Sequence, residues 1–295
     1  MVRTRSIIDS VSNQDVKSHL RKRILFLILV LRRQDLIWEM IDHIFNFIKK
    51  ESLFVEADFS NKRLVGVVFK GIDLRGANFN GSILRTCDFS QANLTDAKMK
   101  KADLEYADLS RADLSRADMR DSTLFGANLE EANLQEALLW YSNMTDTVLV
   151  SANLFRADLR MVVLNCSDMF GANLSQADLT GSIIVEAEMS EVNLEKANLE
   201  KAVLSESHLF MANLHGANLV KCKLEMSNLV SANLSEANME RADLGGANCR
   251  GANMERARLV KTNLYGTRMK EVNLNKANLK DTCLPKANFK GAIIN

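Results

Sequence analysis

A five-residue pattern of apolar and polar positions runs through most of the chain. From Phe59 to Ile294 every fifth residue is apolar, which makes 48 positions without a change of register. The residue two before each is small or apolar, with Lys62 the only charged exception, and the residue between them is usually Asp or Asn. A period of five cannot form a stripe on a helix of 3.6 residues per turn. It fits a three-residue strand followed by two residues that turn the chain.

Glycine falls at one position of this pattern. Twelve of the 13 glycines lie two residues after the central apolar residue. Because glycine has no Cβ atom, it readily adopts positive φ and permits close approach of the backbone. We therefore expect each pentapeptide to end in a tight corner at this position.

The irregularities of the Asp/Asn position predict how many corners close one coil. This position departs from Asp or Asn 17 times. When the positions are sorted by steps of twenty, the series beginning at Arg63 holds eight departures, the series beginning at Asp73 holds one, and the other two hold three and five. A four-sided coil of 20 residues accounts for this imbalance. About twelve such coils, stacked at about 4.8 Å, would form a rod on the order of 58 Å long.

These residues resemble the pentapeptide-repeat family. The segments 107–111 (Ala-Asp-Leu-Ser-Arg) and 232–236 (Ala-Asn-Leu-Ser-Glu) match its A(D/N)LXX pattern. The resemblance implies an all-β solenoid, a right-handed four-sided β-helix, over residues 57–295. It implies little about function, because one fold hosts many unrelated activities.

Residues 1–56 follow a different, helical pattern. Apolar residues fill 24–31 between basic flanks, and a second apolar set runs from Leu36 to Ile48. We predict an α-helical cap, because an open solenoid end exposes an apolar interior and unpaired edges. A membrane-recruited scaffold, with residues 21–50 lying on the bilayer surface, and helix-mediated oligomerisation are the alternatives. The eight-residue apolar run is too short to span a bilayer.

The two ends of the repeat region differ in their core residues. In the first two coils phenylalanine alternates with leucine at the central position, and we expect a wider core there (Phe59, Phe69, Phe79 and Phe89). At the other end the pattern runs to Ile294. We expect the last central residues to lie near an open end that either pairs with a second copy, forming a homodimer through the C-terminal coil, or frays (Leu279, Leu284, Phe289 and Ile294).

Charge and candidate chemistry exclude several function classes. Lys and Arg number 38 against 37 Asp and Glu, so no overall field selects nucleic acid. The five cysteines form no CxxC or Cys/His cluster, which disfavours a metal site and indicates a reducing, cytoplasmic compartment. The four histidines are isolated and no catalytic motif occurs. We therefore predict a non-enzymatic protein without cofactor or metal.

Apolar residues at outward positions are the remaining functional signal. Exposed apolar patches often mark partner surfaces, although scattered apolar residues on a surface are ordinary. We predict a protein-binding surface in the middle of the rod, mostly on two adjoining sides that would form one band. Its residues are Trp140, Tyr141, Val148, Val150, Val163, Phe170, Ile183, Val185, Val203 and Phe210.

The resemblance adds one alternative to this interpretation. Some pentapeptide-repeat proteins resemble duplex DNA in size and charge, bind type II topoisomerases and protect them from quinolone-like poisons. The repeat region here is nearly neutral and its register is uninterrupted, which disfavours a DNA mimic. We therefore predict an interaction or scaffold protein with a protein partner of unknown identity.

Overall fold

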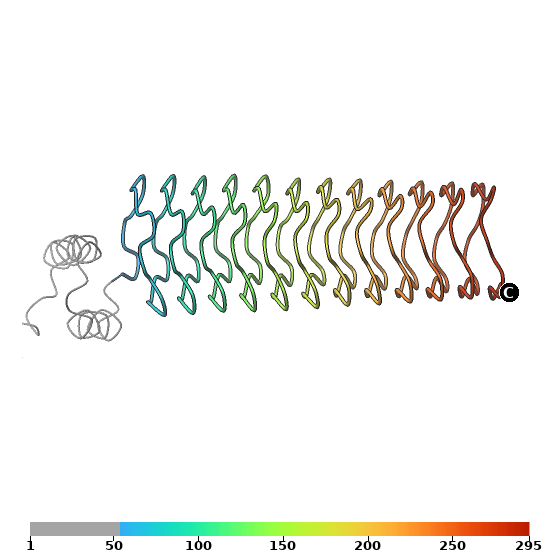
Figure 1. Ribbon diagram of the computed structural model, residues 1–295, viewed down its shortest axis with the longest axis horizontal. Helices are drawn as coiled ribbons and strands as arrows, with labels where there is room; N and C mark the ends of the chain where they lie inside the picture. The colour runs from blue at the N-terminus through green and yellow to red at the C-terminus, as the bar shows by residue number, and fades with distance from the viewer. Residues whose placement is uncertain (1–53, 295) are drawn as a thin grey trace, which may run out of the picture.

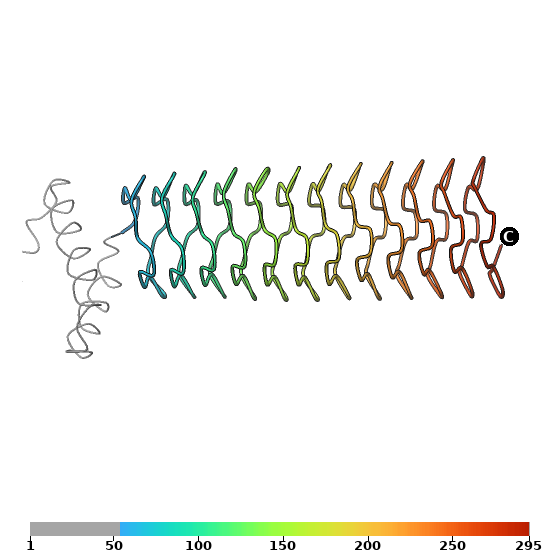
Figure 2. The same ribbon diagram turned by 45° about the horizontal axis from the view of Figure 1, so that its top comes forward.

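The computed structural model describes residues 54–294, which form a straight rod of stacked coils (Figure 1). The coils follow one another in chain order along the rod, as the turned view also shows (Figure 2). The helical cap predicted for residues 1–56 lies almost wholly outside the described residues, as does the stretch 21–50 for which membrane contact was an alternative.

Each coil takes 20 residues, as the irregularities of the Asp/Asn position predict. Within residues 54–294 the structure contains no helix, and its strands are reduced to single bridging residues. From Asp58 to Asn273 each Asp/Asn position pairs in parallel with the position twenty further on, and these pairs form four columns along the rod. We name the four sides of the rod by the first residue of each column: Asp58 begins the first side, Arg63 the second, Val68 the third and Asp73 the fourth.

Backbone hydrogen bonds join each coil to both of its neighbours. Around Asn78, for example, its own N–H donates to the carbonyl of Ala57 at 2.8 Å, and the N–H of Phe79 donates to the carbonyl of Lys98 at 2.6 Å. The N–H of Gly81 donates to the carbonyl of Lys100 at 2.9 Å. The same arrangement recurs from coil to coil, so the backbone polar groups are satisfied without long strands.

The residue two after each central apolar residue has positive φ at every corner, between 53° and 75°. The expectation that glycine marks this position is confirmed. Most corners nevertheless use other residues in the same left-handed conformation, such as Lys201 and Glu206. Thr86 is the only β-branched residue found there in the described chain.

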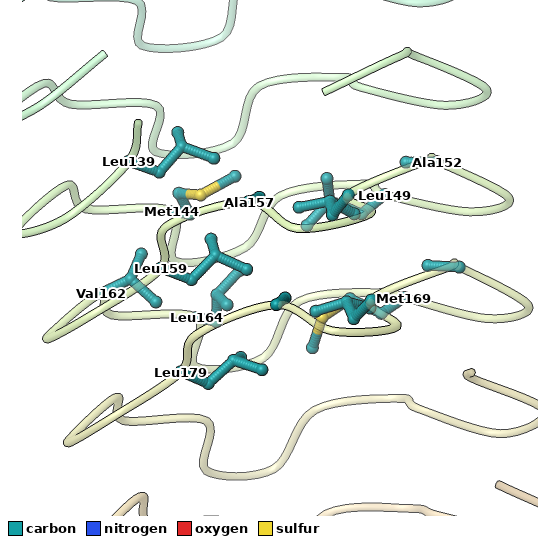
Figure 3. Packing of buried hydrophobic residues seen from close by; sticks show 14 of the residues in the cluster. Leu139, Met144, Leu149, Ala152, Ala157, Leu159, Val162, Leu164, Met169 and Leu179 are labelled. Carbon is teal, nitrogen blue, oxygen red and sulfur yellow. The ribbon is translucent and has the colours of Figure 1, made fainter. Parts of the chain in front are cut away.

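The central apolar residues and the small residues two before them fill the interior. Leu174 and Leu214 are completely buried. Figure 3 shows the central residues of one side stacked one above another (Leu139, Leu159 and Leu179). In the first coils the predicted phenylalanine core is present: Phe59 stacks on Phe79 with ring centroids 4.9 Å apart, and Phe69 on Phe89 at 5.0 Å.

The two ends of the rod differ in the exposure of their core residues. Phe54, Phe59 and Leu64 are buried in the first coil. In the last coil Leu284 is 41% exposed and Ile294 is exposed as well. Leu279 and Phe289 are half-buried there.

Candidate protein-contact surface

The fourth side carries a continuous ladder of asparagine side chains. From Asn133 to Asn273 each Nδ2 donates to the side-chain oxygen twenty residues earlier, at 3.0 to 3.5 Å, and the ladder ends on Oδ1 of Asp113 at 3.1 Å. Each Asn Oδ1 also accepts a backbone N–H two residues further on, as Asn173 does from Ser175. These bonds join neighbouring coils and neighbouring residues of the corner, so the ladder is part of the rod's own structure.

Asp113 terminates this ladder as an acceptor. Burial by itself raises the pKa of this carboxyl, but hydrogen bonds outweigh the effect and leave the pKa below its usual value. The largest lowering effect comes from the side chain and N–H of Ser115, and the amide of Asn133 also donates to Oδ1 of Asp113, at 3.1 Å. The ladder therefore ends on a carboxylate that is held in its charged form.

The second side interrupts the polar pattern with three consecutive apolar residues. Val163, Ile183 and Val203 occupy the Asp/Asn position in adjacent coils and are bridged to one another. Ile183 is 41% exposed. An Asp or Asn there would accept the N–H two residues on; for Val185 this N–H instead donates to Oδ1 of Asn165 in the preceding coil, at 3.0 Å. The apolar column thus replaces turn hydrogen bonds that the repeat normally makes.

An aromatic hollow adjoins this column at the corner between the first and second sides. Trp140, Tyr141, Arg160, Met161 and Thr180 line a space of about 400 Å³. The rings of Trp140 and Tyr141 meet edge to face at 5.3 Å. The hollow and the apolar column lie side by side, because residues 141 and 161 immediately precede the short segments that carry residues 143 and 163.

Two neighbouring features hold the side chains of the hollow in place. Arg120 lies over the Trp140 ring, 5.4 Å from its centroid. Met161 lies over the next corner, where a Cβ atom on Gly181 would come within 2.6 Å of its Sδ. We call the combined surface the apolar strip; it comprises Trp140, Tyr141, Met161, Val163, Ile183 and Val203.

A second apolar surface lies at the corner between the third and fourth sides. Phe170 and Phe210 occupy the first corner residue two coils apart and are 42% and 39% exposed. Val150 holds the same position one coil before Phe170, and the exposed Met211 follows Phe210. We call Val150, Phe170, Phe210 and Met211 the phenylalanine ridge.

The structure divides the predicted band into these two surfaces. Trp140, Tyr141, Val163, Ile183, Val185 and Val203 lie on the second side or at its corners, whereas Val148, Val150, Phe170 and Phe210 lie on the third side or its far corner. The hollow and the ridge occupy diagonally opposite corners, because two full sides separate them. Most of the predicted residues thus lie on two adjoining sides or their corners, but one flat partner surface cannot contact Trp140 and Phe210 together.

Sequence reasoning did not select some residues of these surfaces. Arg120 and Arg160 flank Trp140 in the same corner column, a relation visible only when positions are compared twenty apart. Tyr106 and Met226 are more exposed than any predicted site residue. Both reach over a glycine of the next coil, so their exposure depends on contacts between coils.

His208 and His215 each lie against one side chain of a neighbouring coil. His208 Nδ1 lies 3.1 Å from Oε2 of Glu188 on the third side. His215 Nδ1 lies 2.9 Å from the Ser235 hydroxyl, but that hydroxyl donates to Oδ1 of Asn233 at 2.8 Å and is not directed at the imidazole as a nucleophile would be.

The cysteines divide between the core and the surface. Cys87, Cys222 and Cys249 are buried, as their inward positions predict, and all five cysteines are free thiols. Burial raises the pKa of the Cys249 thiol to about 12. Between residues 54 and 294 no three His, Cys, Asp or Glu side chains gather as they would around a metal ion. In the same range no helix has the length and hydropathy needed to cross a bilayer.

Comparison with protein families identifies the repeat. The family described as pentapeptide repeats matches the chain in 8 copies, over residues 52–91, 92–130, 127–165, 150–184, 187–225, 232–270 and 252–291. No curated protein sequence matches the chain.

Several solved structures are similar to this chain. HetL, a pentapeptide repeat protein involved in heterocyst differentiation regulation in the cyanobacterium Nostoc sp., is 26% identical over 87% of this chain and 98% of its own, with a TM-score of 0.32. A trypsin-treated QnrB1, a plasmid-mediated fluoroquinolone resistance protein, is 16% identical over 82% and 89%, with a TM-score of 0.28. A pentapeptide repeat protein of the Arabidopsis thaliana thylakoid lumen is 32% identical over 36% and 68%, with a TM-score of 0.18.

Proposed function

Because this chain belongs to the pentapeptide-repeat family, we propose that it is a non-enzymatic interaction or scaffold protein whose rod presents contact surfaces to other proteins. The observation that carries the proposal is the set of large apolar side chains at outward positions in the middle of the rod. Phe170, Ile183 and Phe210 each leave about two-fifths of their surface in solvent. Clusters of solvent-exposed apolar side chains are typical of partner surfaces.

The second side supports this proposal because three consecutive bridging positions lack the side-chain oxygen that the repeat normally has there. Asp or Asn at the bridging position accepts a corner N–H on the other sides, as Asn173 and Asp178 do. At Val163 and Val203 no side-chain oxygen is present to do so. A replacement that removes turn bonds without adding to the core is expected where the side chains serve a contact outside the rod.

The partner that we propose for the phenylalanine ridge is a protein with an apolar docking surface. From coil to coil, the two residues at this corner are Val150 and Ser151, Phe170 and Gly171, Ser190 and Glu191, and Phe210 and Met211. Glu191 is the only charged residue among these eight. A charge placed among these side chains would have to be desolvated on binding, which is costly.

The ridge is tested by charge substitution. Phe170→Glu combined with Phe210→Glu should weaken binding of a partner captured from native extract by tenfold or more, measured with purified proteins. Ser110→Glu occupies the same corner position several coils away and serves as the matched control. If the ridge variant captures the same proteins with unchanged affinity, the ridge is not the contact surface.

The N-terminal segment is proposed to cover the first coil. The support is the burial of Phe54, Phe59 and Leu64, because the interior of a terminal coil is exposed unless another segment covers it. Deleting residues 1–53 should accelerate amide exchange in the first coil. Unchanged protection would contradict the cap, and sedimentation of the full chain with liposomes would favour the membrane alternative.

A further inference from the structure

We propose that two copies of this chain pair through their second sides, with the rods antiparallel and Ile183 on the two-fold axis. The inference rests on the proposed function, since both assign the apolar strip to a protein contact. It adds the identity of the partner, which is a second copy of the same rod.

The centre of the second side has the symmetry that such a pair requires. In an antiparallel pair about Ile183, residues equally far from it along the column face each other, so Val163 of one copy meets Val203 of the other. The column is thus apolar on both sides of the axis. On the described parts of the other sides no two consecutive bridging positions are apolar. The second side alone offers a dry centre of the kind that protein interfaces contain.

The charges around this centre are complementary under the same two-fold axis. The two-fold axis lies in the interface plane and is perpendicular to both rods. Under this axis, each corner column of one copy faces the same corner column of the second copy. Arg160 then faces Glu200, and Arg120 faces Glu240, with the same coil spacing from the axis. All four side chains are at least partly exposed, and each already has an ion pair within its own chain.

The second residue of the same corner column follows the same rule. Asp121 faces Arg241 of the second copy, and both side chains are accessible in the single rod. Three pairs of opposite charges between the two copies therefore lie along one corner of the rod. Exposed ion pairs add modest affinity, but they select the orientation and register of two surfaces.

The aromatic hollow also receives a fitting occupant. Val220 of the second copy arrives at Trp140, and Lys221 arrives at Tyr141. The valine supplies apolar surface to a hollow of about 400 Å³. The exposed lysine ammonium can lie against the tyrosine ring, which favours a cation over its face.

Other registers lose these contacts. A shift of one coil in one direction places Trp140 against Glu200 and Arg160 against Thr180. The opposite shift places Trp140 against Glu240 and Val163 against Lys223. The coils of both rods have the same spacing, so their side chains interlock only when one rod is shifted by whole coils. Among these registers, the charge pattern favours the central one.

Two like-charge meetings remain. At the corner between the first and second sides, Lys101 faces Lys261 of the second copy, four coils from the axis. The other lies at the corner between the second and third sides. Glu186 lies near the axis and faces its own equivalent in the second copy. Its side chain is exposed at the rim, so both carboxylates can turn toward solvent.

Cross-linking tests the geometry of the pair. In a chain that carries Cys166→Ser and Cys283→Ser, which remove the two exposed thiols, Asn143→Cys and Lys223→Cys are made separately. These positions face each other across about 10 Å, the usual spacing of packed sheets. A bismaleimide of that reach should link a mixture of the two variants. It should not link either variant alone, since equivalent residues are then offset along the rods by about 19 Å.

Substitutions that preserve the repeat test the energetics. Ile183→Asn introduces the residue that the repeat uses at this position, so the rod should remain folded while self-association weakens by tenfold or more in sedimentation equilibrium. Arg160→Glu should weaken it as well, and adding Glu200→Arg to that variant should restore most of the loss. Arg111→Glu on another corner is the control.

Several outcomes would overturn the pairing. A wild-type rod that stays monomeric at high concentration refutes it, and if the rod still binds its partner through the phenylalanine ridge the proposed function stands. A dimer that survives Ile183→Asn but is lost with Leu284→Glu is an end-to-end contact through the last coil. Cross-links within one variant alone would show another register or a parallel pair.

Discussion

At the scale of single residues, the corner position decides which side chains can be changed. Every corner imposes a left-handed conformation on its second residue, and most of these residues are not glycine. A side chain in this conformation costs roughly 1–2 kcal/mol relative to the right-handed region. The glycines add something different at a few corners: they leave room for a side chain of the preceding coil.

Gly181 and Gly266 form a matched pair for testing that distinction. Both have φ near 66°, but a Cβ atom on Gly181 meets Met161 Sδ at 2.6 Å, whereas nothing lies within 4 Å of one on Gly266. Gly266→Ala should lower the free energy of unfolding by about 1–2 kcal/mol, from backbone strain alone. Gly181→Ala should cost about the same or slightly more, because the methionine end can move.

The readout that separates them is the methyl resonance of Met161. It should shift in Gly181→Ala and stay in place in Gly266→Ala. If Gly181→Ala leaves the Met161 resonance unchanged, this glycine does not shape the aromatic hollow.

At the scale of the repeating element, each pentapeptide is too short to be stable without its neighbours. A one-residue strand makes few bonds, and its stability comes from the same unit in the coils before and after it. The asparagine ladder on the fourth side is the side-chain form of this dependence. Its donors all point toward the preceding coil, so its end at Asp113 differs from every other position.

Asp113 gives the ladder a predictable response to pH. Its pKa is depressed in the folded rod, so its stabilising contribution is fully present above the unfolded value of about 3.9 and is lost as pH falls through the lower folded value. Between about pH 5 and pH 3 the wild-type rod should therefore lose more stability than Asp113→Asn, which has no charge to titrate. Equal acid sensitivity in denaturant titrations at pH 7, 4 and 3 would contradict this role.

At the scale of the whole molecule, the rod formed by residues 54–294 has one continuous apolar core along its length. Each coil contacts only its neighbours, so damage should remain local. Leu174 is completely buried in the middle of the rod, whereas Leu284 is 41% exposed in the last coil.

Substitution of these two leucines should therefore lower the free energy of unfolding by different amounts. Leu174→Ala should reduce stability by about 2–5 kcal/mol, because it leaves a cavity in a packed interior. Leu284→Ala should cost clearly less, because solvent already reaches that side chain. Amide exchange should accelerate most in the coils adjacent to the substitution; uniform acceleration along the whole rod would show that the rod unfolds as one unit.

Much of this architecture follows from local spacing. The apolar residue at every fifth position, the small residue two before it and the glycines at the corners predict a short strand and a turn. The uneven distribution of irregular positions then predicts the 20-residue coil. Phe59 to Phe89 also predict the aromatic core of the first coils. These inferences succeed because side-chain direction in an extended segment alternates with the sequence itself.

The sequence alone thus determined the coil and the direction of each side chain, inward or outward. Only the tertiary structure decided which outward side chains from different coils meet. It placed Trp140 and Phe210 on opposite corners, set Met161 over Gly181, and turned Lys201 and its equivalents into the left-handed conformation. The physical reason is that contacts between residues twenty apart depend on the angle at each corner and the side chain of the next coil, which no local pattern contains.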